Sequence, residues 1–328
     1  MDMTMNELIL HHHDPSPYAE KIRKIFGLKQ LAWQSVQVSM VMPRPEMTSL
    51  TGGYRKIPIL QIGADIYCDT LLIAQILDQL HPDPPLFPSG LMTNLAVQNW
   101  GDAMFRVGAP LAMHENAGNL PAEVIEDRRA YFTFLDFDKF ADNAPHFRSQ
   151  FRAKATLLDA QLADGRPYLL GDSPEWADIN AFFNIWMAGG HIPSAQNMFA
   201  PLQNMANWYK RIEALGQGTR TDIDATQAIE SARQATPHAH ALTHALTQID
   251  TQQADMQQAN KQQKSLADES GLSIGQNVIV TADDYGKDPI AGKLHLINDW
   301  EIVISREEAQ IGELAVHFPR MGFSLTAA

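Results

Sequence analysis

Residues 55–70 of this chain read RKIPILQIGADIYCDT, and this stretch decides the fold that we expect. Two short apolar runs, 57–62 and 66–68, are separated by a Gly-Ala-Asp turn, which is typical of two antiparallel strands joined by a hairpin. Pro58 stands near the start of the first run, where its missing N–H removes no hydrogen bond from a sheet interior. The stretch therefore predicts a hairpin whose first strand begins at a proline.

The segments around this hairpin alternate between strand and helix signals. The apolar run 8–10 predicts a strand, and Pro17 opens a segment with helical apolar spacing that ends near Gly27. Residues 33–40 carry apolar side chains at every second position and predict another strand, while 71–80 predicts a helix that ends before a proline. The N-terminal region thus follows the order β-α-β-loop-β-β-α.

The chain changes character after this region. Four prolines crowd residues 81–88 and predict a stiff linker between two domains. From residue 93 to about 215, apolar residues recur at helical spacing, which predicts a compact all-α bundle. Residues 217–270 are rich in Gln, Ala, Thr and Asp and predict a polar linker or an exposed helix.

The C-terminal residues, 271–328, carry a third pattern. Short runs rich in β-branched residues are separated by Gly and Asp turns, which predicts a small antiparallel β module. We expect Trp300 and Phe318 to anchor its core. The runs are 277–281, 293–297 and 301–305.

The composition limits the possible functions. The chain has 328 residues with 25 basic and 38 acidic side chains, a net charge of −13, which disfavours nucleic acids and anionic membranes as partners. Its single cysteine excludes an intrachain disulfide and a cysteine-rich zinc site. It has neither an apolar run long enough to cross a bilayer nor a signal-peptide pattern at its N-terminus, so we expect a soluble cytoplasmic protein.

Ser16 stands directly before the helix that Pro17 opens, which is the place of an N-cap. One interpretation is that Ser16 is a helix cap and nothing more. Alternatively, its hydroxyl and the positive end of the helix can together stabilise an anion such as a thiolate.

Two further positions leave similar alternatives open. Pro58 is either an edge-strand proline without a ligand role or, if the preceding bond is cis, the residue that turns the backbone of Ile57 toward an extended peptide ligand. Asp69 and Thr70 can cap the following helix, or they can bind the ammonium and carboxylate groups of a ligand.

In this order, these pieces resemble the cytosolic glutathione transferases over about residues 6–215. The resemblance implies an α/β plus all-α fold, with a thioredoxin-like domain over 1–81 and a helical substrate-binding domain over 90–216. It also implies a cytoplasmic homodimer with a role in detoxification. The C-terminal β module is not part of the usual pattern. Further matches are 84–88, 168–171, 177–179 and 208–212.

The resemblance also implies a glutathione site. Ser16 corresponds to the hydroxyl that hydrogen-bonds the glutathione sulfur, and the backbone of Ile57 beside cis-Pro58 pairs with the cysteinyl part. Asp69 and Thr70 correspond to the pair that holds the γ-glutamyl end. Many family members have Glu-Ser or Gln-Ser there, so the shorter aspartate changes the reach of the site.

The implied reaction is attack by the glutathione thiolate on a small hydrophobic electrophile, with glutathione as co-substrate and no metal. Candidate pocket residues are Tyr18, Phe105, Arg106 and His114. A serine instead of a cysteine at position 16 disfavours a reductase. The alternatives are a non-catalytic stress or protein-binding factor with this fold, and a glutathione-dependent isomerase or dehalogenase.

Other reactive residues fit structural roles better. At most two of the histidines at 11–13 share a face of a strand, and no third ligand is nearby, so we expect no metal site. Cys68 reads as a small buried side chain at a strand end. We expect Asp178 to be structural, with Glu175 at the position where the family's helix cap has Ser or Thr.

Overall fold

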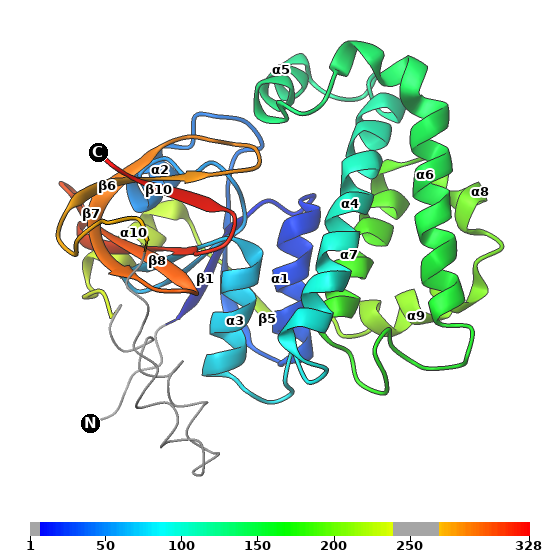
Figure 1. Ribbon diagram of the computed structural model, residues 1–328, viewed down its shortest axis with the longest axis horizontal. Helices are drawn as coiled ribbons and strands as arrows, with labels where there is room; N and C mark the ends of the chain where they lie inside the picture. Colours follow the sequence, from blue (N-terminus) through cyan, green and yellow to red (C-terminus); the bar gives the residue numbers. More distant parts are fainter. Residues whose placement is uncertain (1–6, 239–268) are drawn as a thin grey trace.

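The computed structural model of the chain describes residues 7–238 and 269–328, and ten strands from these residues form a single sheet (Figure 1). The strand order is β10-β6-β7-β8-β9-β4-β3-β1-β2-β5. The first four strands in the sequence therefore lie side by side, with strands from the C-terminal half of the chain added at both edges.

The N-terminal region has the expected thioredoxin-like arrangement. β1 pairs with β2 in parallel and with β3 in antiparallel fashion, and β3 and β4 form the antiparallel hairpin that the sequence predicts. The elements are β1 Leu8–His12, α1 Pro17–Leu28, β2 Ala32–Gln37, α2 Pro45–Thr51, β3 Ile59–Ile62, β4 Asp65–Cys68 and α3 Thr70–Leu80.

An all-α bundle follows the proline-rich connection, as expected. The long helices α4, α6 and α7 form its centre, and α1 of the N-terminal region packs against α7. Gly101 allows α4 to lie close to α7, because a Cβ there would stand 2.4 Å from the carbonyl oxygen of Asn180. The helices are α4 Leu91–Glu115, α5 Ala122–Tyr131, the 3-10 turn η1 Phe137–Lys139, α6 Phe140–Gln161, α7 Trp176–His191, α8 Ala195–Phe199 and α9 Gln203–Glu213.

Asp178 has the structural role that we expected of it. Its carboxylate accepts hydrogen bonds from the backbone N–H groups of Leu169 and Glu175, at 2.9 and 3.0 Å, and from Trp208 Nε1 at 2.7 Å. Burial raises the pKa of Asp178 to about 6, and these three donors oppose that rise. The residue thereby joins the start of α7 to α9.

The stretch 217–270, which we expected to be a polar linker or an exposed helix, is partly built into the sheet. β5 Thr219–Asp222 pairs in parallel with β2, and α10 Ala225–Arg233 follows it. Small side chains make this possible, because Ala228 and Ala232 are buried although the segment has few large apolar groups. The remainder of that stretch, residues 239–268, lies outside the described residues. The boundaries 1–81 and 90–216 remain our prediction.

The C-terminal strands form the expected antiparallel module, but they continue the N-terminal sheet. β9 pairs in parallel with β4, with Ile66 opposite Val316. Phe318 is fully buried, as expected of a core anchor, whereas Trp300 is 56% exposed. The expectation for Trp300 was wrong because this residue lies in the turn between β7 and β8. The strands are β6 Asn277–Ala282, β7 Ile290–Ile297, β8 Glu301–Glu308, β9 Gly312–Pro319 and β10 Phe323–Ala327.

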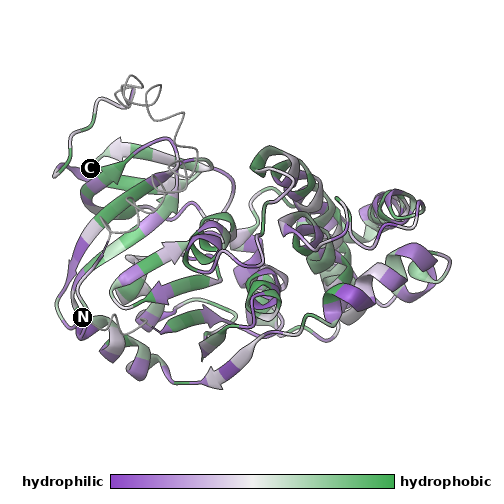
Figure 2. Cartoon of the chain, turned by 90° about the horizontal axis from the view of Figure 1, so that it is seen from below, coloured by the Kyte–Doolittle hydropathy of each residue, from purple (hydrophilic) through white to green (hydrophobic). Residues whose placement is uncertain are grey.

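Apolar residues gather on the strands and between the helices of the bundle (Figure 2). Tyr54, from the N-terminal region, packs edge-to-face on Phe318 of β9, with ring centroids 5.9 Å apart. The C-terminal strands and the N-terminal region therefore share one core. Within the described ranges, no helix is long and apolar enough to cross a membrane.

Candidate functional site

Ser16 lies at the N-terminus of α1 and faces a cavity of about 290 Å³. Its Oγ accepts a hydrogen bond from the backbone N–H of Ala19 at 3.2 Å, so it is the N-cap that the sequence predicts. Pro17 occupies the first helical position, where no N–H is needed. A hydroxyl and the positive end of a helix therefore meet at the wall of one cavity.

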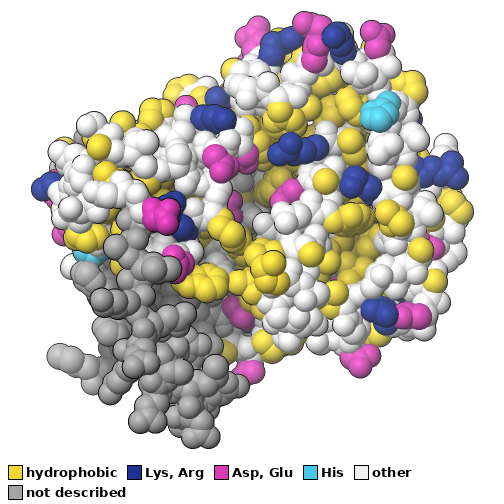
Figure 3. Space-filling view, viewed as in Figure 1, with side chains coloured by type: hydrophobic (Ala, Val, Ile, Leu, Met, Phe, Trp, Pro, Cys, Tyr) yellow, Lys and Arg dark blue, Asp and Glu magenta, His cyan; other side chains and the backbone are white. Residues whose placement is uncertain are grey.

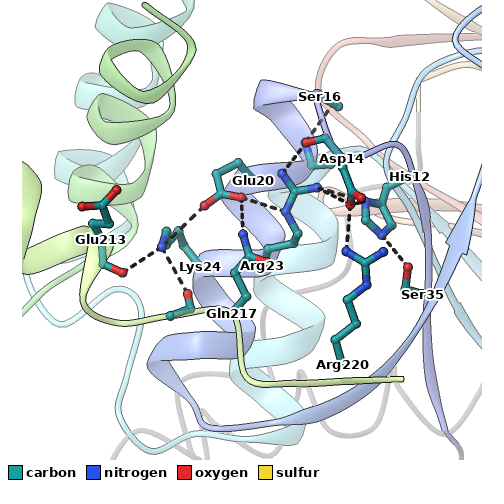
Figure 4. Close-up of polar contacts among 12 residues, drawn as sticks. His12, Asp14, Ser16, Glu20, Arg23, Lys24, Ser35, Glu213, Gln217 and Arg220 are labelled. Carbon is teal, nitrogen blue, oxygen red and sulfur yellow. Dashed lines mark hydrogen bonds and ion pairs between the residues drawn. The ribbon is translucent and has the colours of Figure 1, made fainter. Parts of the chain in front are cut away.

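A polar network, buried at Arg23 and Glu20 and exposed at Asp14, holds the loop that carries Ser16 (Figure 4). Arg23 Nη2 donates to the backbone oxygen of Asp14 at 2.9 Å, and Arg23 Nε donates to Glu20 Oε2 at 2.7 Å. Arg220, on β5, pairs with the Asp14 carboxylate at 2.8 Å. Charges on α1 and a strand distant in sequence together fix the position of the loop.

Ile57 and Pro58 lie beside the Ser16 cavity at the start of β3. The Ile57–Pro58 peptide bond is cis. Ile57 lines both the Ser16 cavity and a second cavity of about 160 Å³, whereas Pro58 lines only the second one. Ile57 is thus one of the residues of the N-terminal region that connect the two cavities.

Asp69 and Thr70 line the second cavity, where β4 meets α3. Asp69 has a φ of +78°, a left-handed conformation that is uncommon for a residue with a side chain, and its carboxylate accepts a hydrogen bond from Leu71 N–H at 2.8 Å. Burial raises the pKa of Asp69, while the Leu71 N–H and the nearby Lys56 and Lys21 oppose this rise. Backbone and charge thus hold a carboxylate at the cavity wall.

Three of the four candidate pocket residues lie at the cavities. Tyr18 and Phe105 line both of them, with ring centroids 5.0 Å apart, and Arg106 lines the smaller one. Tyr18 Oη donates to Asp102 Oδ1 at 3.3 Å. The structure does not bring His114 to either cavity wall, although it lies on α4 like Phe105.

Lys21 is a site residue that the sequence reading missed. Its ammonium group is buried between the rings of Tyr18 and Phe183, 4.4 and 4.1 Å from their centroids, and lies 3.7 Å from Asp102. Burial lowers the pKa of Lys21, whereas the nearby carboxylates raise it. No sequence signal marks Lys21 as buried, because charged side chains are rarely buried in this way.

Three arginines at the larger cavity were also missed: Arg44, Arg55 and Arg128. Asp127 accepts ion pairs from Arg55 and Arg128, both at 2.7 Å. Burial is the largest cause that lowers the pKa of Arg44 to about 10, and the charge of Arg128 is the second largest. Basic side chains, in dark blue, are visible around the hollow between the two halves of the molecule (Figure 3).

The histidines of β1 have structural contacts. His11 Nε2 and Gln61 Oε1 are hydrogen-bonded at 2.8 Å, and His12 contacts Ser35 and Arg23. No group of three His, Cys, Asp or Glu side chains within 7–238 and 269–328 is arranged to hold a metal ion. Cys68 is buried, and burial raises the pKa of its thiol, so this group is far from a reactive thiolate.

This chain combines a thioredoxin-like sheet with an all-α bundle, and Ser16 caps α1 at the wall of a cavity between them. This arrangement is that of glutathione transferase-like proteins. Residues 10–85 match the family model of the glutathione S-transferase N-terminal domain. A GST-like protein from Pseudomonas syringae has 29% sequence identity and a TM-score of 0.73, with 99% of this chain and 100% of that chain covered. This similarity therefore extends over the C-terminal strands.

A probable glutathione S-transferase, parA, from Nicotiana tabacum is 25% identical over 101 residues, which is 30% of this chain. The matched region spans 46% of that relative, or about half of its length. On these findings, residues 10–85 are similar to the glutathione S-transferase N-terminal domain, and the chain over nearly its whole length is similar to a GST-like protein.

Proposed function

We propose that the protein binds glutathione and conjugates its thiolate to a small hydrophobic electrophile. The observation that carries this proposal is the position of Ser16, whose hydroxyl stands at a helix N-terminus and at the wall of the larger cavity. Ile57, Asp69 and Thr70 supply the cysteinyl and γ-glutamyl contacts in the proposal. Glutathione is the co-substrate, and the proposal includes no metal.

The chemistry follows from the ionisation of a thiol. A free thiol with a pKa near 8.5 is mostly protonated at neutral pH, and only the thiolate is a strong nucleophile. In the proposal, the Ser16 hydroxyl donates to the sulfur, and the positive end of α1 stabilises its charge. Together they lower the thiol pKa by roughly one to two units, or about 1.4 kcal/mol for each unit.

The electrophile occupies the remainder of the larger cavity in this proposal. Apolar side chains from α4 and α5 face it, among them Met113, Val124 and Ile125, and the Phe105 ring lies at the junction with the smaller cavity. Such a wall favours an apolar substrate body. The thiolate forms a bond to the electrophilic carbon, and either a leaving group departs with its electron pair or the product takes up a proton.

Assembly and location are also proposals. We propose a cytoplasmic homodimer with a role in detoxification, as the family resemblance implies. Light scattering of the purified protein tests the dimer, for which a mass near twice the 36.5 kDa of the chain is expected. A monomeric mass would contradict it.

Isothermal titration with glutathione tests the proposed ligand. We expect heat of binding at millimolar glutathione or below, and no binding in that range would exclude the proposed function. Conjugation of a panel of electrophiles, followed at neutral pH, then tests the reaction. Binding without turnover would favour a non-catalytic factor, and turnover without loss of glutathione would favour an isomerase.

The variant Ser16→Ala tests the role of the hydroxyl. We expect the conjugation rate at neutral pH to fall by roughly 3- to 20-fold, because the fraction of thiolate falls with the loss of one donor. Ser149→Ala, an exposed position on α6, is the matched control and should retain the rate. An unchanged rate in Ser16→Ala would assign the role to Tyr18 or to a backbone N–H.

A further inference from the structure

The turn between β6 and β7, residues 283–288, reaches from the C-terminal strands into the cleft. We call it the Tyr285 turn; in Figure 1 it is the orange loop that extends toward α5. The ring of Tyr285 packs against Tyr131, Phe132 and Phe134 of the helical bundle, with centroids 5.1, 5.4 and 5.5 Å away. A segment outside the usual family pattern thus contacts the substrate side of the cleft.

The same turn also contacts the thioredoxin-like side of the cleft. Asp284 forms an ion pair with Lys56, the residue directly before Ile57. Lys56 Nζ lies 4.5 Å from the centroid of the Tyr285 ring. The turn therefore contacts both the helical bundle and Lys56, which lies shortly before β3.

Gly286 allows this close approach. Its φ is +62°, and a Cβ at this position would stand 2.7 Å from Tyr131 Cε2. The backbone of the turn is therefore packed against the end of α5 with little space to spare.

Tyr285 lines both cavities of the site. Ser16 lines only the larger one, and Asp69 and Thr70 line only the smaller one. The contacts of the Tyr285 ring with Tyr131, Phe132 and Phe134 hold it at the junction of the two cavities. A ligand that extends from Ser16 past Ile57 to Asp69 meets this tyrosine.

We propose that Tyr285 is a specificity-determining residue of the thiol site: its ring stands between the Ser16 cavity and the Asp69–Thr70 cavity, so a peptide thiol that spans both must displace the Tyr285 turn. The identity of this ligand as glutathione rests on the proposed function, whereas the position of the turn does not. When only a fraction of molecules has the turn displaced, the apparent affinity for a spanning ligand falls by that fraction.

Glutathione titrations of Tyr285→Ala and Asp284→Asn test this inference in the full-length protein. The first variant removes the obstructing ring, and the second removes the ion pair to Lys56 while leaving the ring. We expect the dissociation constant for glutathione to fall at least threefold in both variants, with faster association in stopped-flow measurements. Asp288→Asn, an exposed position in the same turn, is the matched control and should bind like the wild type.

Equal or weaker binding in both variants would overturn the inference, because the tyrosine would then be an ordinary wall residue or a ligand contact.

If neither the wild type nor Tyr285→Ala binds glutathione, the proposed function fails, and hydrogen exchange still decides whether the turn moves. We expect the amides of residues 283–288 to exchange at least tenfold faster than those of β6 and β7, and faster again in Asp284→Asn. Exchange as slow as in the flanking strands would exclude a displaceable turn.

Discussion

His317 Nε2, on β9, lies 3.0 Å from Asp65 Oδ1, on β4, and the two side chains are buried at the seam where the C-terminal strands join the N-terminal sheet. The other ring nitrogen pairs with Glu301 of β8, and the Tyr67 ring stacks on the imidazole at 4.3 Å. Burial alone would lower the pKa of His317, but the two carboxylates outweigh it and raise the pKa from 6.5 to about 9.

This arrangement predicts that the protein loses stability as the solution becomes alkaline. Because the folded-state pKa of His317 is raised, its contribution is fully present below about pH 6.5 and is lost as the pH rises through about 9. The contribution is of the order of 3 kcal/mol. Urea unfolding at about pH 6 and about pH 10 measures the expected fall in the free energy of unfolding.

The variant His317→Gln isolates this effect. It should cost about 3–5 kcal/mol near neutral pH, because two buried carboxylates lose their cationic partner, and it should flatten the decline between the two pH values. His146→Gln, at an exposed position on α6, should keep the wild-type decline. If His317→Gln declines as steeply as the wild type, the imidazole is not the group responsible.

Arg23→Gln should destabilise the protein strongly. The change leaves the buried carboxylate of Glu20 without its 2.7 Å contact and the Asp14 carbonyl without its donor, and breaking a buried pair costs about 3–5 kcal/mol. Arg152→Gln, an exposed arginine of α6, should change the free energy of unfolding by less than about 0.5 kcal/mol. Similar unfolding midpoints for the two variants in urea would show that the network contributes little.

Replacing either of two glycines of the helical bundle with alanine should change the stability of the protein, in opposite directions for the two positions. Gly101→Ala places a Cβ 2.4 Å from the Asn180 carbonyl oxygen and should cost about 1–3 kcal/mol by forcing α4 and α7 apart. Gly189→Ala, exposed near the end of α7, meets no atom within 4 Å and should stabilise the protein by about 0.5–1 kcal/mol. Thermal unfolding compares them, and a destabilised Gly189→Ala would contradict the reasoning.

Signals confined to a few neighbouring residues were predictable from the sequence. Ser16 before Pro17, and Asp69 before the apolar segment 71–80, announce helix starts because capping depends on side chains within one turn. The hairpin around Asp65 is equally local. These short-range rules fix the elements and also fix which candidate site residues stand at element ends.

Contacts between distant segments were not predictable in this way. An alternating strand can pair with any free edge, so nothing in β9 announces that His317 meets Asp65, 252 positions away. Tyr285 looks like a turn residue beside acidic neighbours, and its contact with Tyr131 depends on how two domains pack. Lys21 lies on the polar face of α1, and only the bundle that covers this face buries it.

The ten-stranded sheet has a consequence for the solubility of shortened forms of the chain. Without β9 and β5, both β4 and β2 would present rows of unpaired N–H and C=O groups, and such open borders recruit strands from other molecules. Segments that follow the helical bundle in sequence thus shield both borders of the four-stranded centre. A fragment ending at residue 216 would keep the helical bundle and the strands β1–β4, yet both borders would be open to cross-strand association between copies.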